Sequence, residues 1–331
     1  MIVVKHSHSS LVINHHALTL DQTTIPIFFS DKHLYALPKN HRFPIDKYIL
    51  VKEQLLYQGI IQREQITDPG VCSEEDILRV HTPEYWQAVK TQTLLPRMVR
   101  RIGLPNTETS VNRARNSVAG TIAAAEAALQ TGLGVNLAGG THHAYPDRGE
   151  GFSTLNDIAI ASRRLLAQGL VERILVIDLD VHQGNGNAFI FQNDPAVFTF
   201  SMHGKDNYPL KKEHSDWDIA LPTGTNDNEY LKLLEDALPK LLERQQPQLV
   251  FYQSGVDVLV TDRLGKLVLT KAGCRRRDEL VFEHCFQSGI PVVTTMGGGY
   301  SERMADIVDA HCNTIEIGLT NYSDYYRIAN V

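Results

Sequence analysis

The sequence lacks several features that would place it in a common class of protein. No apolar run approaches the ~20 residues that a membrane-spanning helix needs, and the N-terminus has no apolar core typical of a secretory signal. The formal net charge is -6, so no overall positive field is available to hold a nucleic-acid backbone. We therefore expect a cytoplasmic protein that binds neither membranes nor nucleic acids directly.

Cysteine is scarce, with four residues among 331 and no Cys-x-x-Cys pair, which argues against a disulfide framework and a cysteine-based zinc knot. A Gly-x-Ser-x-Gly elbow is also missing, so a serine hydrolase is not expected. No repeat and no linker rich in Gly, Ser or Pro divides the chain. We expect a peripheral segment over residues 1–24 and one domain over residues 25–331.

Short apolar runs alternate with longer amphipathic stretches. The runs predict strands at Ile25–Phe29, Gly134–Ala138, Ile174–Leu179, Ala196–Ser201, Leu249–Gln253, Pro291–Thr295 and Thr314–Gly318. The amphipathic stretches predict helices at Asp46–Gln58, Ser110–Thr131, Asp157–Gln168, Asn228–Arg244, Ala272–Ser288 and Ser301–His311. Several of the strands are apolar on both faces, as in a sheet that is covered on both sides. The pattern predicts a single α/β domain with a central, mostly parallel sheet of about eight strands flanked by helices.

Five of the predicted strands are followed by His, Asp or Tyr close to glycine or serine. These polar clusters are Gly139–His143, Asp180–Gly186, Met202–His203, Ser254–Asp257 and Met296–Tyr300. The carboxyl ends of parallel strands share one edge of the sheet, and ligands usually bind there. The five clusters therefore predict one site.

The pair Asp180 and His182 indicates a metal site, because residues i and i+2 of an extended segment point the same way. Asp257, at another strand end, is the candidate third ligand. Two carboxylates and one imidazole suit zinc with an open position for water, and the same set suits iron(II) or manganese. In the alternative interpretation, Asp178 and Asp180 cap the following helix or pair with arginines.

The adjacent His142 and His143 are candidate acid–base groups, and each needs a partner that fixes its tautomer. Asp178 and Asn185 are the candidate partners. Tyr300 follows three glycines and could donate a hydrogen bond to a developing oxyanion. Alternatively, the histidines are ordinary surface or core residues and Tyr300 is an aromatic lid on a flexible turn.

Three short basic runs lie outside these clusters. Lys211–Lys212 and Arg275–Arg277 are expected to be solvated surface faces. Arg100 and Arg101 are expected to line an entrance.

Together these motifs resemble the zinc-dependent histone deacetylase family of the arginase/deacetylase superfamily. The resemblance covers roughly residues 25–320, and HRFPIDKY (41–48) and RRDELVF (276–282) look most like its class IV branch and bacterial relatives. Its main carriers are GGTHHAYPDRGEGFSTLNDIAIA (139–161), VIDLDVHQGNGN (176–187), SMH (201–203), SGVDVLVTDRLGKLVLT (254–270) and MGGGY (296–300).

The resemblance implies a role for each matching residue. The implied zinc ligands are Asp180, His182 and Asp257, and the implied catalytic residues are His142, His143 and Tyr300, with Asp178 and Asn185 behind the histidines. The implied substrate-binding groups are the Gly151 carbonyl and the aromatic walls Phe152 and Tyr208. A structural potassium ion is implied at Asp178, Asp180, His182, Ser201 and Met202, and a second one near Phe191, Asp194 and Val197. The sequence departs from the family pattern at Asn185, where aspartate is common, and at Met296, where glycine is common.

The implied activity is zinc-dependent removal of acetyl or longer acyl groups from the lysine side chains of proteins. In the implied mechanism, His143 is the general base and Tyr300 stabilises the oxyanion. Three alternatives stay open: hydrolysis of acetylpolyamines or other small amides, a ureohydrolase with two manganese ions, and a non-catalytic acyl-lysine reader. The sequence does not indicate an oligomeric state.

Overall fold

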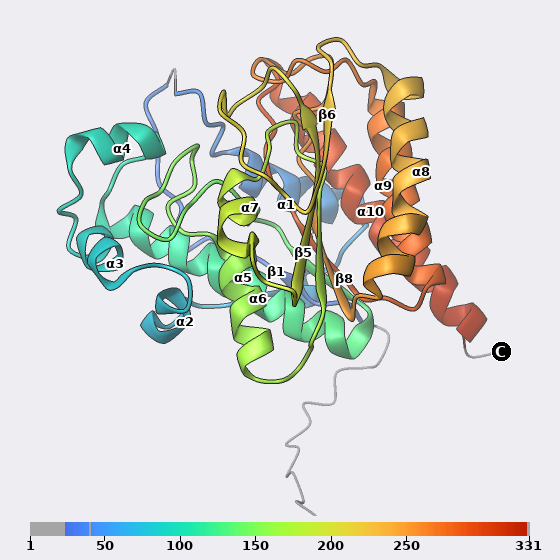
Figure 1. Cartoon of the computed structure of the whole chain (residues 1–331), viewed down its shortest axis with the longest axis horizontal. Helices are drawn as coiled ribbons and strands as arrows, with labels where there is room; N and C mark the ends of the chain where they lie inside the picture. Colours follow the sequence, from blue (N-terminus) through green and yellow to red (C-terminus); the bar gives the residue numbers. More distant parts are fainter. Residues whose placement is uncertain (1–23, 40, 330–331) are drawn as a thin grey trace, which may run out of the picture.

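Eight parallel strands form one continuous sheet in the computed structural model, which describes residues 24–39 and 41–329 (Figure 1). The strands are β1 (Ile27–Phe28), β2 (Ile66–Thr67), β3 (Leu133–Asn136), β4 (Ile174–Asp178), β5 (Val197–Gly204), β6 (Trp217–Leu221), β7 (Leu249–Gln253) and β8 (Val292–Thr295). Their order across the sheet is β2-β1-β3-β8-β7-β4-β5-β6, and every neighbouring pair is parallel. The predicted fold class is confirmed, and the sheet is parallel throughout.

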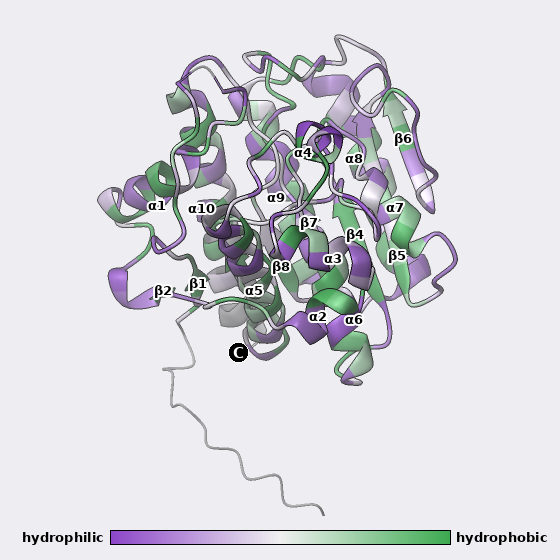
Figure 2. Cartoon of the chain, turned by 90° about the vertical axis from the view of Figure 1, so that its left-hand side faces the viewer, coloured by the Kyte–Doolittle hydropathy of each residue, from purple (hydrophilic) through white to green (hydrophobic). Residues whose placement is uncertain are grey.

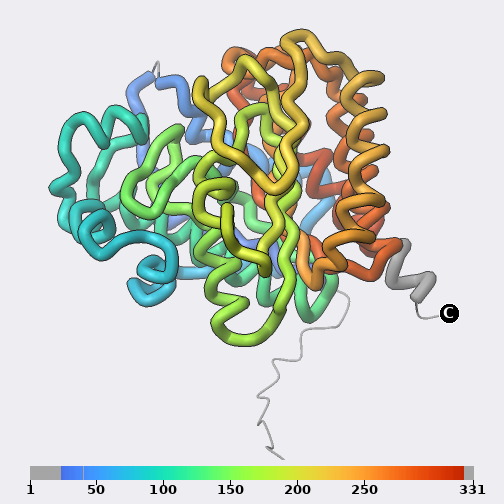
Figure 3. The backbone as a smooth tube through the Cα atoms, in the orientation of Figure 1, coloured from blue at the N-terminus to red at the C-terminus, as the bar shows by residue number. Residues whose placement is uncertain are grey.

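Helices cover both faces of this sheet. One face packs against α1 (Lys47–Tyr57), α8 (Asp227–Gln245), α9 (Lys271–Gln287) and α10 (Met304–Ala329). The other packs against α2 (Glu74–Leu78), α3 (Pro83–Lys90), α4 (Pro96–Ile102), α5 (Glu108–Thr131), α6 (Asp157–Ala167) and α7 (Asn185–Phe191), and a short 3-10 helix spans Arg63–Gln65. The chain path in Figure 3 shows the same division, with the green and cyan helices on one side of the sheet and the orange and red ones on the other.

The central strands are buried on both faces, as their composition predicts. In β4, Ile174 and Val176 pack into one hydrophobic cluster, whereas Leu175 and Ile177 pack into the other. Successive side chains of a strand point to opposite faces, so an unbroken apolar run can fill two cores at once. These strands are coloured as hydrophobic in Figure 2.

The longer helices begin where side chains can satisfy free backbone N–H groups. Thr107, Asn156, Asn226 and Thr270 precede α5, α6, α8 and α9, and each accepts a hydrogen bond from the N–H three residues later. Helix α5 ends at Gly132, whose φ of 93° belongs to the left-handed region that glycine adopts without strain. Local capping thus fixes the ends of the helices that lead into and out of the sheet.

The predicted strand Thr314–Gly318 is wrong, because this segment lies within α10. Ile307, Cys312, Ile315 and Leu319 follow helical spacing and pack against the core that contains α9. The β-branched residues near Ile315 looked locally like a strand, but the helical period continues on both sides of them.

Two strands of the structure had no counterpart in the prediction. β2 contains two residues and β6 is a partly exposed edge strand, so neither carries the apolar run that marked the others. Helices α2, α3, α4 and α7, each eight residues or shorter, were also missed.

The predicted peripheral segment, residues 1–24, falls almost wholly outside the described residues. In the part of the chain that the structure does describe, no helix is both long and apolar enough to cross a membrane.

Candidate active site

Four adjacent strands, β3, β8, β7 and β4, end at the same level of the sheet. Asn136 pairs with Thr295, Thr295 with Gln253, and Gln253 with Asp178. The side chain of Gln253 connects the loops that follow, because it accepts a hydrogen bond from Thr295 Oγ1 (2.7 Å) and donates one to the Gly140 carbonyl (2.9 Å). The four loops therefore start side by side, and they carry most of the predicted site.

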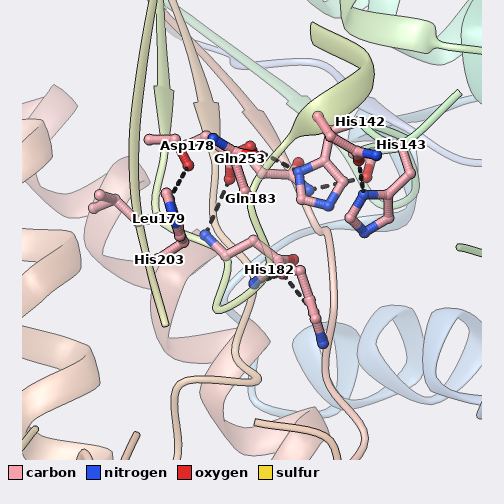
Figure 4. Close-up of polar contacts among 12 residues, drawn as sticks. His142, His143, Asp178, Leu179, His182, Gln183, His203 and Gln253 are labelled. Carbon is pink, nitrogen blue, oxygen red and sulfur yellow. Dashed lines mark hydrogen bonds and ion pairs between the residues drawn. The ribbon is translucent and has the colours of Figure 1, made fainter. Parts of the chain in front are cut away.

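The three predicted metal ligands converge. Asp180 and His182 follow β4 and Asp257 follows β7, and one potential ligand atom from each lies within 4.8 Å of the other two. The His182 Nδ1 is 3.1 Å from Asp180 Oδ1 and 3.1 Å from Asp257 Oδ2. The three side chains are at most 8% exposed. Figure 4 shows the His182 ring beside the pair His142 and His143.

The charge balance at this position fits a divalent cation. Burial and the neighbouring Asp180 carboxylate both disfavour a charge on Asp257 and raise its pKa to about 7. The two carboxylates outweigh burial at His182 and raise its pKa to about 10, so a proton on Nδ1 would lie between two acids. A metal ion would relieve the same repulsion, and two carboxylates with one imidazole are a donor set that zinc accepts.

Glycine is required where neighbouring loops pack directly against the carboxylates. The Gly298 N–H donates a 2.7 Å hydrogen bond to Asp180 Oδ2. A Cβ on Gly298 would lie 1.9 Å from Asp257 Oδ2, and one on Gly255 would lie 2.2 Å from Asp180 Oδ2. The glycines of the Met296–Tyr300 loop thus allow close approach to the ligands.

His142 has a carboxylate partner. Its Nδ1 lies 2.7 Å from Asp178 Oδ2, and both side chains are more than 90% buried. Burial alone would lower the pKa of His142, but the Asp178 and Asp180 carboxylates overcome this effect and raise the pKa to about 9. The Asp178 partner therefore favours the charged form of His142.

His143 has a neutral partner. Burial, followed by the charges of His142 and His182, holds the pKa of His143 well below its usual range. The Asn185 amide N–H2 donates to Glu150 Oε1 (2.8 Å), which turns its oxygen toward His143 Nδ1 at 2.6 Å. His143 Nδ1 must then be the donor, so the neutral ring has its lone pair on Nε2.

Glu150 is a site residue that the sequence did not reveal. Its second carboxylate oxygen lies 3.1 Å from Arg101 Nε, so Arg101, Glu150, Asn185 and His143 form a connected chain. Glu150 follows a non-strand segment and belongs to no recognisable spacing pattern. The Asn185 side chain lies between the Glu150 carboxylate and the His143 ring.

Aromatic side chains surround the mouth of the site. The Tyr300 ring lies 6.2 Å from the His182 ring and 5.9 Å from that of Phe152, and the Tyr208 ring lies 5.1 Å from that of His143. Phe152, Tyr208 and Tyr300 line a cavity of about 680 Å³ that opens to solvent. Arg100 and Arg101 line the same cavity, where an entrance was expected.

Gly151 lines both this cavity and a smaller one bounded by His142 and His143. Its φ is 57°, and a Cβ there would lie 2.5 Å from His143 Cδ2. Phe152 also has a positive φ of 63°, which is uncommon for a non-glycine residue. This strained turn brings the Gly151 backbone and the Phe152 ring to the inner end of the cavity.

The interpretation of Arg277 as part of a solvated surface is wrong. Its side chain is fully buried, lies 2.7 Å from Asp278 Oδ1 and donates a 2.6 Å hydrogen bond to the Gly255 carbonyl. It also reaches the Leu179 carbonyl at 3.3 Å, so it joins the ends of β4 and β7 beneath the metal ligands. Arg275 and Arg276 do lie on the surface, where they pair with glutamates.

Lys47 is a second buried cation that the sequence did not indicate. Its ammonium donates a 2.7 Å hydrogen bond to the Gly297 carbonyl and lies 5.7 Å from the centre of the Tyr300 ring. Burial lowers the pKa of Lys47 to about 8, although Asp257 and Asp180 oppose this shift. Lys47 therefore supports the loop that carries Tyr300.

The residues matched to potassium sites lie where two strands adjoin. Asp178 pairs with Ser201 across β4 and β5, and Met202 follows in β5. Asp178 Oδ1 accepts a 3.1 Å hydrogen bond from the Asp180 N–H. In the suggested second site, the Phe191 carbonyl accepts a hydrogen bond from Asp194 N–H, and the Asp194 carbonyl accepts one from Val197 N–H.

The fold and the buried ligand set define an α/β protein with a candidate metal centre at the carboxyl edge of its sheet. The histone deacetylase domain model matches residues 41–315, so the chain belongs to the histone deacetylase family. An uncharacterized protein of Picosynechococcus is 47% identical over 86% of this chain and 95% of its own length. Histone deacetylase 2 of Arabidopsis thaliana is 31% identical over 84% of this chain and 74% of its own length.

The fold also matches a solved structure. The crystal structure of a histone deacetylase homologue from Aquifex aeolicus superimposes with a TM-score of 0.74 at 24% sequence identity, covering 89% of this chain and 84% of the homologue. At that identity the likeness concerns the fold alone.

Proposed function

We propose that this chain is a zinc-dependent hydrolase that removes acyl groups from lysine side chains of proteins or peptides. Membership of the deacetylase family supports a deacetylase hydrolase. The observation that carries the finer proposal is the arrangement of Asp180, His182 and Asp257 at the end of an aromatic-lined cavity, beside one histidine that contacts a carboxylate and one that contacts an amide.

The triad would hold the zinc ion, with iron(II) or manganese as the alternatives that suit the same ligands. Zinc held there would supply a Lewis acid for the acyl carbonyl and lower the pKa of a bound water toward ~7. The three residues of the triad belong to the loops after β4 and β7, and Arg277 connects these two loops through the Leu179 and Gly255 carbonyls.

His143 is the general base in this proposal. Its Nδ1 is committed to Asn185, so only Nε2 is available to take a proton from the attacking water. Burial and the neighbouring charges of His142 and His182 lower the pKa of His143, which favours the neutral ring. After attack, the same nitrogen would pass the proton to the leaving lysine amine.

His142 and Tyr300 stabilise the negative charge that develops on the acyl oxygen. The Asp178 partner holds His142 protonated, so His142 contributes a positive charge. Burial, together with the carboxylates of Asp257 and Asp180, raises the pKa of Tyr300 above its usual value, and the phenol therefore stays a hydrogen-bond donor.

The acyl-lysine side chain would enter through the main cavity. Phe152 and Tyr208 would pack against its methylene groups, and the Gly151 carbonyl would accept the amide N–H. Arg42, Arg100, Arg101 and Lys266 line this cavity, and Asp206 is the one acid among its described lining residues. This charge balance favours a peptide over a cationic polyamine as the substrate.

Potassium is part of the proposal as a structural ion near Asp178. The Asp178 carboxylate orients His142, so a potassium ion bound to Asp178 would also affect His142. The second suggested site, near Phe191, has no role in the mechanism proposed here.

The test is a panel of acetyl-, butyryl- and myristoyl-lysine peptides with acetylspermidine, assayed with and without a metal chelator. The proposal predicts release of acid from at least one peptide, loss of release on chelation and recovery when zinc is returned. Binding of acyl peptide without release of acid would contradict it, and so would chelator-resistant turnover.

A further inference from the structure

Two smaller cavities adjoin the candidate catalytic centre, and each shares lining residues with the next. The first, of about 30 Å³, is bounded by both catalytic histidines and Tyr300. The second, of about 50 Å³, shares Phe43, Tyr48, Thr141 and Phe152 with the first. One water needs roughly 10–15 Å³ of such space, so the two cavities together hold a group of several heavy atoms.

Arg113 lines the second cavity and has no partner there. The residue is 8% exposed, and its Nη1 is enclosed without a hydrogen bond. Within the described residues, Arg113 makes no ion pair, and no Asp or Glu lines this cavity. Its guanidinium does stack 4.7 Å from the centre of the Tyr48 ring, which leaves the N–H edges of the fork unused.

The other buried arginine among the described residues is paired, and so is the partly buried Arg115. Arg277 contacts Asp278 and three backbone carbonyls. Arg115, two residues after Arg113 on α5, donates two hydrogen bonds to the Cys72 carbonyl. An enclosed guanidinium without a hydrogen-bond partner is costly to the folded protein, so the cavity at Arg113 has the character of an anion site.

The geometry suits a carboxylate in particular. A guanidinium presents parallel N–H groups that match the two oxygens of a carboxylate. Tyr48 and Tyr35 line the same cavity. A carboxylate there would meet the charged guanidinium beside two phenol side chains.

We propose that the cavity at Arg113 binds the terminal carboxylate of a dicarboxylic acyl group, so that the enzyme removes malonyl-, succinyl- or glutaryl-type groups from lysine. The inference rests on the proposed hydrolase function and names its substrate class. Water would add its oxygen to the acyl carbon, the amide C–N bond would break, and the lysine nitrogen would take the proton. The products are the lysine amine and a free dicarboxylate.

The path of the acyl chain follows from the order of the cavities. The main cavity takes the lysine side, and the catalytic groups lie at its inner end. The carbon atoms of the acyl group beyond its carbonyl would then occupy the two smaller cavities. Thr141 is a short side chain at the junction, and its hydroxyl is held by Asp157 Oδ1 at 2.6 Å.

The test compares each acidic acyl-lysine peptide with an analogue in which the terminal carboxylate is replaced by the uncharged amide. For wild type, we expect kcat/KM for at least one acidic acyl group to exceed that of its amide analogue by about 10- to 100-fold, the usual effect of a charge-assisted hydrogen bond. Arg113→Met should abolish this ratio and leave acetyl-lysine hydrolysis within about threefold of wild type. Arg115→Met, on the same helix, should keep the ratio.

Equal rates for carboxylate and amide analogues in wild type would overturn the inference, and this comparison needs no variant to fold. A ratio that survives Arg113→Met would overturn it as well. Inhibition by free acetate that depends on Arg113, without any gain for acidic acyl groups, would assign the cavity to the released product instead. If the enzyme hydrolyses acetyl-lysine but does not distinguish carboxylate from amide analogues, only this inference is wrong. If no acyl-lysine peptide is hydrolysed, the proposed function is wrong too.

Discussion

The two adjacent histidines differ in their partners. His142 lies against the Asp178 carboxylate and His143 against the Asn185 amide, although both rings are almost fully buried. The carboxylate favours the charged ring and the amide does not, so the pKa values move in opposite directions. Two residues of one type can therefore act as a fixed positive charge and as a neutral base.

The first prediction at this scale separates the two histidines. His143→Ala removes the proposed general base, so kcat should fall by about 10³-fold or more. His142→Ala removes only the positive charge that stabilises the oxyanion, so kcat should fall less than in His143→Ala. The measurement is single-turnover hydrolysis of an acyl-lysine peptide, and equal residual rates would contradict the single-base assignment.

The second prediction concerns pH. Activity should fall as pH rises through the pKa of His142, because deprotonation removes the positive charge. A cation bound by the triad would offset the carboxylates that raise this pKa. The midpoint of the fall in activity should therefore lie at or below about pH 9. Asp178→Asn removes the carboxylate that raises this pKa, so the alkaline limb of the kcat/KM profile should move to lower pH. An unchanged limb would show that another group controls it.

The third prediction tests Tyr300. Tyr300→Phe keeps the ring that packs near His182 and Phe152 but loses the hydroxyl donor, so kcat should fall by ~10²-fold or more. Metal content should remain that of wild type, because Tyr300 is not a ligand. Wild-type turnover by this variant would remove the phenol from the mechanism.

At the scale of the elements, the site depends on strands that end in register. All three candidate metal ligands follow the ends of β4 and β7, and Arg277 from α9 connects both ends through backbone carbonyls. The same helix places Arg275 and Arg276 on the surface. Helix α9 is thus both a cover for the sheet and a support for the metal site.

The fourth prediction compares two arginines of α9. Arg277→Met leaves the Asp278 carboxylate buried without its cation, so the free energy of unfolding should fall by about 3–5 kcal/mol. Arg275→Met removes a half-exposed pair with Glu316 and should cost less than about 1 kcal/mol. Urea unfolding measures both, and equal losses would contradict the role given to Arg277.

Several elements could be predicted from the sequence because their signals are local. Apolar runs identified the central strands, and capping residues such as Thr107 and Asn226 mark the helix starts. The prediction of a strand at Thr314–Gly318 was wrong, because a five-residue window cannot show that the helical period continues on both sides of the segment. The edge strand β6 was missed because it is only partly buried.

At the scale of the whole molecule, the site joins residues that are far apart in the sequence. Motifs at strand ends could predict Asp180, His182 and Asp257, because parallel topology brings such ends together. Nothing local predicted that Lys47 contacts Gly297, 250 residues away, or that Glu150 lies behind Asn185. Those contacts depend on the packing of complete elements. The class IV assignment stays a prediction.

The most direct test of the central claim is the number of metal ions bound per chain, measured by mass spectrometry of wild type and Asp257→Asn. Asparagine keeps the shape of the side chain but removes a charged ligand, so the variant should stay folded and bind zinc at least about 10-fold more weakly. The account predicts one zinc per wild-type chain and a largely metal-free variant. Two ions per chain, or a variant that retains its metal, would contradict it.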